Sequence, residues 1–316
     1  MPSYSGAVTE APDGGLRLDR YIAEYLKILS RSQIKARKAT AKVNGKEVKI
    51  SRTLKTGDWL ELSWEESPPA CLVPEDLPLD IIYEDSKIIV INKAQGMVVH
   101  PGAGNFTGTL ANALLFRIMS RQGKGAFVSP GSLGNIRPGI VHRLDKDTSG
   151  LIVCAFDEKS HEFLSGQFKN RRVIKTYAAL VKGCPKEDRG RIETGILRDQ
   201  KNRKLFTVSS SKGKPSLTLF RLVKTWGNYS LLLLRPKTGR THQLRVHLKA
   251  LGNPILGDPL YGGEISLKPF RPAGLPDLTL MLHAKRLSIV LPGNTGLSTF
   301  RTAFPERFRE FIHGND

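Results

Sequence analysis

The sequence predicts an α+β fold in two domains, a small basic one followed by a larger one. Apolar runs typical of strands are mixed with helical patterns, and the two do not alternate regularly as they would in a doubly wound sheet. Residues 64–80 form an acidic, proline-rich stretch between two basic regions, and proline stiffens a linker. The length of 316 residues suits one large domain or two ordinary ones.

The expected domain boundaries follow the distribution of charge along the chain. Residues 1–14 carry two acidic side chains and are expected to form a flexible leader. Residues 15–63 carry 12 basic and 5 acidic side chains and form the first domain. Residues 64–80 are the expected linker, and residues 81–316 form the second domain.

The elements of the first domain follow from local patterns. An apolar residue recurs at helical spacing at Leu18, Tyr21, Ile22, Tyr25, Leu26 and Leu29. Ser30 and Gln33 have the spacing of a capping box, which predicts a second helix that begins at Arg31. Asn44-Gly45 is typical of a tight hairpin turn, and residues 59–62 alternate like a strand.

The second domain is expected to contain a sheet with few helices. Short apolar runs predict strands at residues 88–91, 151–153, 177–181, 217–223, 229–234 and 287–291. Residues 160–168 have the pattern of a helix. Because the strands greatly outnumber the helices between them, α+β is favoured over a parallel α/β arrangement.

The charge points to a polyanionic partner. Lys and Arg number 49 against 29 Asp and Glu, so the formal net charge is +20, which suits nucleic acid or an acidic membrane surface. No apolar run approaches the ~18 residues that span a membrane, and the beginning of the chain has no signal-peptide pattern. The three cysteines have no CxxC spacing, which is typical of reduced thiols in a cytoplasmic protein.

Four polar motifs interrupt the apolar runs of the second domain. They are residues 92–102 (NKAQGMVVHPG), 142–151 (HRLDKDTSGL), 175–181 (KTYAALV) and 238–262, which begins TGRTHQLRVHL. Asp145 stands in a loop before a predicted buried strand, where catalytic groups are often placed, although an acid beside a turn is commonly a cap. Tyr177 taken alone is typical of a half-buried core aromatic.

Metal and nucleotide sites are not predicted. His242 and His247 are five residues apart, which on a helix separates them by about 140°, whereas helical zinc pairs are spaced by four residues. We expect these histidines to be structural or to contact RNA. The loop at Gly96 matches neither a Walker A motif nor a dinucleotide fingerprint, so no nucleotide cofactor is expected.

Taken together, the four motifs resemble the pseudouridine synthases of the RluA type. They occur in the family order NKxxGxxVHP, HRLDxxTSGL, KxYxAxV and TGRTHQLRVHLxxxGxPIxGDxxYG, and the resemblance covers residues 80–316. Residues 100–105 and 108–115 are most similar to the RluD branch, which acts on large-subunit ribosomal RNA. Ala94 stands where the family usually has proline, and residues 121–136 differ in length.

The first domain, residues 15–63, resembles the S4 RNA-binding domain. That resemblance implies that the basic second helix contacts RNA phosphates through Arg31, Lys35, Arg37 and Lys38. Without it, the same pattern also fits a small amphipathic domain with a solvated charged face. Charge alone does not distinguish RNA from DNA.

The family resemblance implies a reaction and roles for particular residues. It implies isomerisation of uridine within RNA to its C-glycoside, with no metal or other cofactor. Asp145 would act near C1′, and the sequence leaves open whether it is a nucleophile or a base at C2′. Arg245 would pair with Asp145, Tyr177 would support the flipped uracil and place a hydroxyl near C5, and Arg143 would enter the space that the base leaves. We also expect RNA contacts from His142, Lys175, Arg240 and His242.

The resemblance also implies a fold. The family has a mixed, largely antiparallel sheet in two subdomains with the active cleft between them, and we expect a monomer that binds large-subunit ribosomal RNA or a ribosomal precursor particle.

Three different functions would also suit a chain with this charge. A non-catalytic RNA-binding or ribosome-assembly factor would share the basic first domain, but would not need Asp145, Tyr177 and Arg245 together. A related synthase that acts on tRNA would share the motifs. A metal-dependent nuclease would suit a basic chain with histidines and aspartates, but it requires a cluster of metal ligands that the sequence does not supply.

Overall fold

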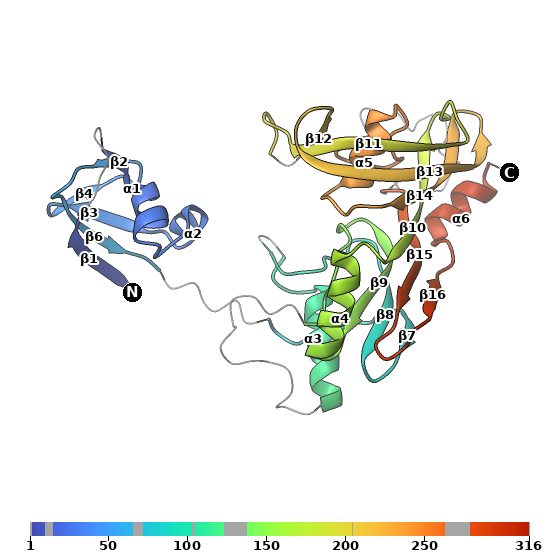
Figure 1. Cartoon of the computed structure of the whole chain (residues 1–316), viewed down its shortest axis with the longest axis horizontal. Helices are drawn as coiled ribbons and strands as arrows, with labels where there is room; N and C mark the ends of the chain where they lie inside the picture. Colours follow the sequence, from blue (N-terminus) through green and yellow to red (C-terminus); the bar gives the residue numbers. More distant parts are fainter. Residues whose placement is uncertain are drawn as a thin grey trace. The chain divides into compact units, whose positions relative to one another are not determined.

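The structure is a computed structural model that describes residues 2–9, 15–65, 72–102, 105–122, 138–203, 205–262 and 279–315. These residues form two compact units, one up to residue 65 and one from residue 72 onward (Figure 1). Residues 66–71 of the expected linker and 123–136 of the segment with unusual length lie outside the described residues.

The first unit is built on a four-stranded antiparallel sheet in the order β1-β6-β3-β4. These strands are β1 (Ser3–Ala7), β3 (Thr40–Val43), β4 (Lys46–Val48) and β6 (Trp59–Ser63). A separate pair joins β2 (Leu16–Arg17) to β5 (Thr53–Leu54). The helical elements are α1 (Leu18–Arg20), the π-turn η1 (Tyr21–Tyr25) and α2 (Arg31–Ala36).

Two local predictions in this unit are confirmed. The capping box is complete, because Gln33 N–H donates to Ser30 Oγ at 3.3 Å and Ser30 N–H donates to Gln33 Oε1 at 2.8 Å. Asn44 and Gly45 both have positive φ, at 52° and 76°, as a tight hairpin turn between β3 and β4 requires.

Two other expectations for this unit differ from the structure. The helix expected over residues 18–29 ends at Tyr25, and Lys27 has a φ of 53°, a left-handed conformation that an α-helix cannot continue through. The leader expected to be flexible contains strand β1, which pairs with β6 along its length. Val8 directly after it is buried in the core of the unit, and this apolar anchor explains why the segment is ordered.

The second unit contains a ten-stranded sheet, mixed and largely antiparallel as expected. Its order is β12-β11-β13-β14-β10-β15-β9-β8-β7, with β16 paired to β15, and the single parallel pair is β9 with β15. The strands are β7 (Ile81–Glu84), β8 (Ile88–Lys93), β9 (Ser149–Ala155), β10 (Ile174–Lys182), β11 (Arg189–Arg198), β12 (Phe206–Ser209), β13 (Lys214–Trp226), β14 (Tyr229–Pro236), β15 (Leu282–Val290) and β16 (Leu297–Arg301). The helices are α3 (Leu110–Gln122), α4 (Glu158–Lys169), α5 (Gln243–Ala250) and α6 (Glu306–His313).

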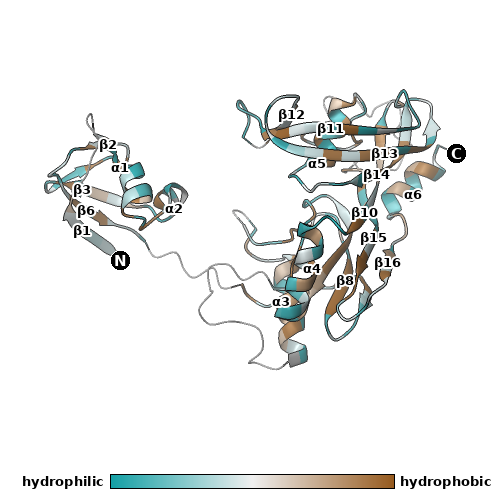
Figure 2. Cartoon of the chain, viewed as in Figure 1, coloured by the Kyte–Doolittle hydropathy of each residue, from teal (hydrophilic) through white to brown (hydrophobic). Residues whose placement is uncertain are grey.

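The central strands carry apolar runs whose residues are buried on both faces, because helices cover both faces of the sheet. Ile89 and Ile91 of β8 pack in one buried cluster with residues of α3, whereas Ile88 and Val90 pack in another with Leu164 of α4. In Figure 2, the central strands β8, β10 and β15 are coloured mainly as hydrophobic. A strand buried on both faces has a continuous apolar run rather than an alternating one.

Strand β15 lies between β9 and β10, which are consecutive strands of the chain but do not pair with each other. Ala284 of β15 is paired with Tyr177 of β10 on one side and with Gly150 of β9 on the other. Gly150 has a φ of 112°, and a Cβ built there would lie 2.4 Å from the carbonyl oxygen of Ala284. Only glycine therefore permits this close parallel pairing, which brings the loop before β9 to the same part of the sheet as Tyr177.

Candidate active site

A cavity of about 510 Å³ opens in the second unit. Its walls come from residues within 141–148, 168–177 and 235–245, together with Leu282. Each residue that the sequence analysis placed in the reaction or in RNA contact within this unit lines it: Arg143, His142, Asp145, Lys175, Tyr177, Arg240, His242 and Arg245. The topology thus brings three motifs together, and the motif at residues 92–102 supports them from behind.

The cavity wall is strongly basic. Among the described residues of this wall, eight carry a positive side chain, namely Arg143, Lys169, Arg171, Lys175, Arg235, Lys237, Arg240 and Arg245, and only Asp145 carries a negative one. A cavity with this imbalance attracts a polyanion and raises its local concentration. Asp145 is the one carboxylate that such a ligand meets on this wall.

The loop that carries Asp145 is held by its backbone. Lys146 O accepts from the side chain of Lys93 at 3.0 Å and from Gly96 N–H at 3.0 Å. Asp147 O accepts from Gln95 Nε2 at 2.9 Å, and Thr148 N–H donates to Asp145 O at 3.1 Å. These contacts fix the backbone at Asp145 and directly after it, while the Asp145 side chain faces the cavity.

Lys93 is the buried residue behind this loop. It is 1% exposed, and its ammonium group donates to the carbonyl oxygens of Ala94, Met97 and Lys146 at 2.8, 2.9 and 3.0 Å. Burial lowers the pKa of Lys93 to about 8, against the opposing influence of the charges of Asp147 and Asp145. All three donors are satisfied, so Lys93 acts as a clamp between the two loops.

Arg245 lies beside Asp145, as expected, but Asp258 is its main partner. Arg245 Nε and Nη2 donate to the two oxygens of Asp258, each at 2.7 Å, whereas Nη1 is 3.5 Å from Asp145 Oδ2. Burial lowers the pKa of Arg245, but the hydrogen bonds and charge of Asp258, with the charge of Asp145, outweigh it and raise that pKa. The guanidinium is therefore always charged and bidentately fixed.

His242 also lies near Asp145. Its Nε2 is 4.0 Å from Asp145 Oδ2, and its Nδ1 is 2.9 Å from the hydroxyl of Tyr261. Burial lowers the pKa of His242, which the charge of Asp145 partly offsets, so the ring is neutral at pH 7.

The turn before α5 is held by Gln243, whose amide uses all of its hydrogen-bonding capacity. Its oxygen accepts from Thr238 Oγ1 at 2.7 Å and from Arg240 N–H at 3.0 Å. Its nitrogen donates to Leu217 O at 3.1 Å and to Thr218 Oγ1 at 3.0 Å. This buried amide therefore ties the turn that carries Arg240 and His242 to strand β13.

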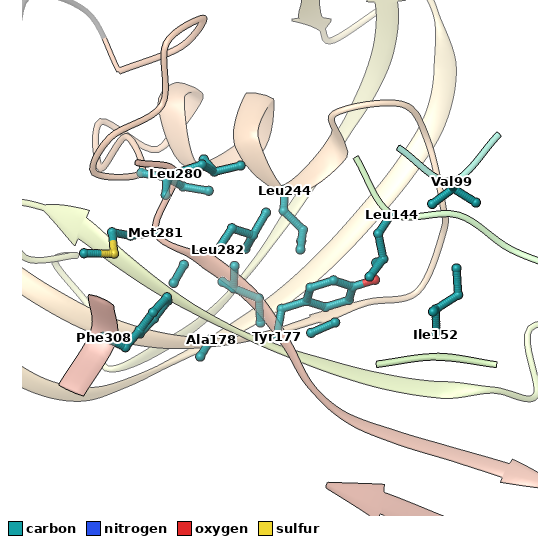
Figure 3. Close-up of a cluster of buried hydrophobic side chains, with 14 of the residues drawn as sticks. Val99, Leu144, Ile152, Tyr177, Ala178, Leu244, Leu280, Met281, Leu282 and Phe308 are labelled. Atoms are coloured by element: carbon teal, nitrogen blue, oxygen red, sulfur yellow. The ribbon is translucent and has the colours of Figure 1, made fainter. Parts of the chain in front are cut away.

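Tyr177 lies at the base of the cavity on β10. Its ring is 8% exposed and packs in a buried cluster with Leu144, Leu244 and Leu282 (Figure 3). No described residue makes a hydrogen bond to its hydroxyl. Burial, with a smaller contribution from the charge of Asp145, raises the pKa of this phenol above its usual range, so it is neutral at pH 7.

The remaining cavity residues differ in how firmly they are held. The ring of His142 stacks on Phe168 at 4.4 Å, its Nε2 accepts from Val153 N–H at 3.1 Å, and burial lowers its pKa to about 3. Those contacts place His142 in the structural wall. Lys175 lies 6.0 Å from the Phe168 ring, and burial lowers its pKa. Arg240 Nε donates to Pro215 O at 3.2 Å.

Arg143 is exposed and makes no side-chain hydrogen bond or ion pair within the part of the chain that the structure describes. It stands two residues before Asp145 on the cavity wall. Lys169, Arg171, Arg235 and Lys237 on the same wall also have no side-chain partner among the described residues, but Arg143 is the one that shares the loop of Asp145.

The four basic residues of the first unit that were expected to contact RNA lie on or next to α2. Arg31 donates to Asp19 Oδ2 at 3.1 and 2.9 Å, and Lys38 pairs with Glu65 at 3.0 Å. Lys35 is exposed, and Arg37 follows as the C-cap of the helix. Two of these four cations are thus paired within the unit.

Three residues of the site were missed by the sequence analysis. Asp258, Tyr261 and Lys93 were each part of a motif, but their spacing gave no sign of which residues they contact. One signal in the sequence could have pointed to these contacts. An arginine, a histidine or a lysine that becomes buried requires a polar partner, so a polar residue elsewhere in the motifs had to supply one.

The described residues contain neither a candidate membrane span nor a candidate metal site. No helix in those ranges is long and apolar enough to cross a membrane. No three His, Cys, Asp or Glu side chains in the same ranges are grouped so that they could hold a metal ion.

Comparisons with known proteins agree with the motifs. Residues 87–250 match a family model described as RNA pseudouridylate synthase. "Ribosomal large subunit pseudouridine synthase D" of Borreliella burgdorferi is 45% identical over 95% of this chain and 90% of its own length, and the protein of that name in Zymomonas mobilis is 37% identical over 92% and 91%. A solved structure, human RNA pseudouridylate synthase domain containing 1, is 31% identical with a TM-score of 0.54 and covers 72% of this chain and 84% of that one.

Proposed function

Because this chain belongs to the RluA-type family of RNA pseudouridine synthases, which are isomerases, we propose that it converts uridines of large-subunit ribosomal RNA to pseudouridine. Two relatives that align over nine-tenths of their length are named for the large ribosomal subunit, which supports this choice of RNA. The same RNA within a ribosomal precursor particle is an equivalent substrate under this proposal.

The observation that carries the proposal is the position of Asp145. Of the described residues that line the cavity, it is the single carboxylate beside eight cationic side chains, and Arg245 stands 3.5 Å from it. A polyanion drawn into this cavity meets one group that can act as a nucleophile or a base, and the neighbouring guanidinium favours its ionised form. We assign Asp145 as the carboxylate that acts at the target ribose.

The reaction rearranges bonds without any net gain or loss of atoms. The bond between N1 and C1′ breaks, the uracil turns, C5 bonds to C1′, and the proton that leaves C5 is balanced by one gained at N1. Asp145 acts at the sugar, and the hydroxyl of Tyr177 lies near the uracil for the final proton transfer. The apolar cluster around Tyr177 excludes water from the turning base.

The target base must first leave the RNA stack. Extrusion of a base costs a few kcal/mol, and a side chain that fills the vacated space lowers that cost. Arg143 is an exposed cation of this cavity with no side-chain partner in the described ranges, it lies on the same loop as Asp145, and its planar guanidinium can stack and donate hydrogen bonds. We assign it this role, with Lys175 and Arg240 as phosphate contacts.

We further propose that residues 15–63 are an S4-like RNA-binding domain, joined by the linker at 64–80 to the catalytic domain at 81–316. The order of helix, basic helix, hairpin and closing strand supports this assignment. Its contribution is affinity along the phosphate backbone rather than sequence readout.

The experiment is to map pseudouridines in all cellular RNA with and without this protein. Sites in large-subunit ribosomal RNA that disappear without it and return with the wild-type gene support the proposal. A gene for the Asp145→Asn variant, which keeps the shape and loses the charge, is expected to restore none of them while the purified variant still binds the RNA. If the only pseudouridines that disappear are in tRNA, the substrate is tRNA and not ribosomal RNA.

A further inference from the structure

We propose that His242 recognises the 2′-hydroxyl of the target ribose through its Nε2 atom and so restricts the enzyme to ribonucleotides. This inference rests on the proposed function, which places the target sugar at Asp145. It concerns a different property, the discrimination between ribose and deoxyribose at the modified position.

The ring of His242 is oriented by Tyr261. The Tyr261 oxygen accepts from Phe206 N–H at 2.9 Å and lies 2.9 Å from His242 Nδ1. The Tyr261 hydroxyl can donate its own hydrogen to Nδ1 while it accepts from the backbone. We assign this arrangement, in which the neutral imidazole carries its proton on Nε2 and Nε2 is a donor.

The backbone and the ring contacts restrict His242 further. It adopts a φ of 56° and a ψ of 17° at the N-cap of α5, a left-handed conformation that is uncommon for a side chain of this size. Its ring contacts those of Phe206 and Tyr261 edge-on, each with centroids 5.6 Å apart. An uncommon backbone conformation that several contacts enforce is typical of a functional position.

The other ring nitrogen faces the cavity without a partner. Nε2 is 4.0 Å from Asp145 Oδ2, too far for a hydrogen bond, and no other residue in the described ranges bonds to it. Both His242 and Asp145 line the cavity, with side chains 18% and 22% exposed. A donor held beside the carboxylate but not bonded to it is positioned for a ligand that lies against both.

The chemistry of the substrate identifies that ligand group. If Asp145 acts at C1′ or C2′, the 2′-hydroxyl is attached next to the reacting carbon and lies beside the carboxylate. This hydroxyl accepts and donates hydrogen bonds, and it is the group by which a protein distinguishes RNA from DNA. Nε2–H of His242 supplies a donor to it at the flank of Asp145.

The test compares two variants on two substrates. His242→Asn keeps an amide near the Nδ1 position and tolerates the left-handed backbone, but it has no atom at Nε2. His242→Gln reaches the Nε2 position. Each is assayed under single-turnover conditions on an oligonucleotide that spans a mapped target site and on the same oligonucleotide with 2′-deoxyuridine at the target.

With the ribose substrate we expect His242→Asn to lower the rate about tenfold, the value of one net hydrogen bond. With the deoxy substrate we expect the variant and the wild type to react at the same rate, because the contact is absent in both. His242→Gln is expected to recover most of the loss on ribose. For each sugar, the rate of the variant is divided by the rate of the wild type. Comparison of these two ratios cancels the intrinsic difference in reactivity between ribose and deoxyribose.

Equal losses on both sugars would overturn the inference, because His242 would then contact a base or a phosphate or would only support the fold. The same comparison of His242 variants and wild type is made with dissociation constants for the two oligonucleotides, in proteins that also carry Asp145→Asn. Binding can then be compared even if the deoxy substrate reacts too slowly for its rate to be measured. A wild-type enzyme that forms no product from the ribose oligonucleotide would instead refute the proposed function, and the two failures are therefore distinguishable.

Discussion

Arg245 and Asp258 form a bidentate ion pair with two hydrogen bonds of 2.7 Å, and both side chains are almost fully buried. Asp258 Oδ1 also accepts from the backbone N–H groups of Leu260 and Tyr261 at 2.9 and 3.0 Å. The pair therefore turns a single amino group of Arg245 toward Asp145. Asp145 gains a nearby positive charge, but its oxygens are not occupied by a bidentate partner and remain available to the substrate.

Asp258→Asn should destabilise the protein and impair turnover. The substitution keeps the shape but leaves the Arg245 guanidinium buried without an opposite charge, which lowers the free energy of unfolding by about 3 kcal/mol. Urea denaturation measures this change. Glu187→Gln, at an exposed acid, is the matched control, and equal losses in the two variants would show that the ion pair does not stabilise the fold.

Tyr177→Phe should retain RNA affinity and lose turnover. The ring packing is unchanged, whereas the hydroxyl proposed for the final proton transfer is lost, which lowers the single-turnover rate on the order of a hundredfold. The control is Tyr83→Phe on β7, which removes a hydroxyl that donates to Asp85. An unchanged rate for Tyr177→Phe would limit that residue to support of the base.

The stability of the protein should fall between pH 6.5 and pH 4, in part because of His247. This residue is fully buried between Ser216 and Thr218 at 2.9 and 3.0 Å, and burial lowers its pKa from 6.5 to about 4. The unfolded chain takes up the proton first as the pH falls. The stabilisation is thus complete above pH 6.5 and is lost as the pH approaches 4, by roughly 3 kcal/mol.

Denaturation at several pH values in this range measures that loss. In His247→Gln the free energy of unfolding should depend less steeply on pH, by up to one proton, than in the wild type. The exposed His313 provides the control variant His313→Gln. Parallel pH dependences for wild type and His247→Gln would contradict the assignment.

Gly150→Ala should destabilise the protein more than Gly96→Ala. Both glycines have positive φ, at 112° and 85°, so both variants carry backbone strain. A Cβ at position 150 would meet the backbone of Ala284, whereas nothing lies within 4 Å of a Cβ at position 96. The difference in the free energy of unfolding, about 1–3 kcal/mol, measures the cost of this collision. Equal effects would mean that β9 and β15 can separate at little cost.

Lys35→Gln should reduce the salt dependence of RNA binding by about one unit of logarithmic slope. Lys35 has no ion pair within the described residues and is free to meet a phosphate, whereas Arg31 would have to give up Asp19. Arg31→Gln is therefore expected to change the slope less. An unchanged salt slope for Lys35→Gln would show that Lys35 on α2 does not contact RNA phosphates.

Local signals in the sequence predicted local structure well. The capping box at Ser30 and the turn at Asn44-Gly45 depend on residues within four positions, and both are present. The apolar runs that predicted strands correspond to β8, β9, β10, β13, β14 and β15. The apolar pattern of residues 18–29 predicted burial of Leu29 correctly, but not the left-handed Lys27 that ends the helix.

The contacts that build the site depend on residues far apart in the sequence. The family resemblance implied that Arg245 would pair with Asp145, but the preference of Arg245 for Asp258 depends on the turn after residue 254. In the same way, nothing local shows that Ala284 separates Gly150 from Tyr177. Such pairings follow from strand order in the whole sheet, which single segments do not specify.

The position of β15 between β9 and β10 has a consequence for synthesis of the protein. Strands β9 and β10 are consecutive in the chain, yet they meet only through β15, which is made more than a hundred residues later. Domains begin to fold from the N-terminal side while the ribosome is still adding residues. The Asp145 loop and Tyr177 therefore cannot take up their final positions until residues 282–290 have emerged, and a nascent chain shorter than this has no working enzyme.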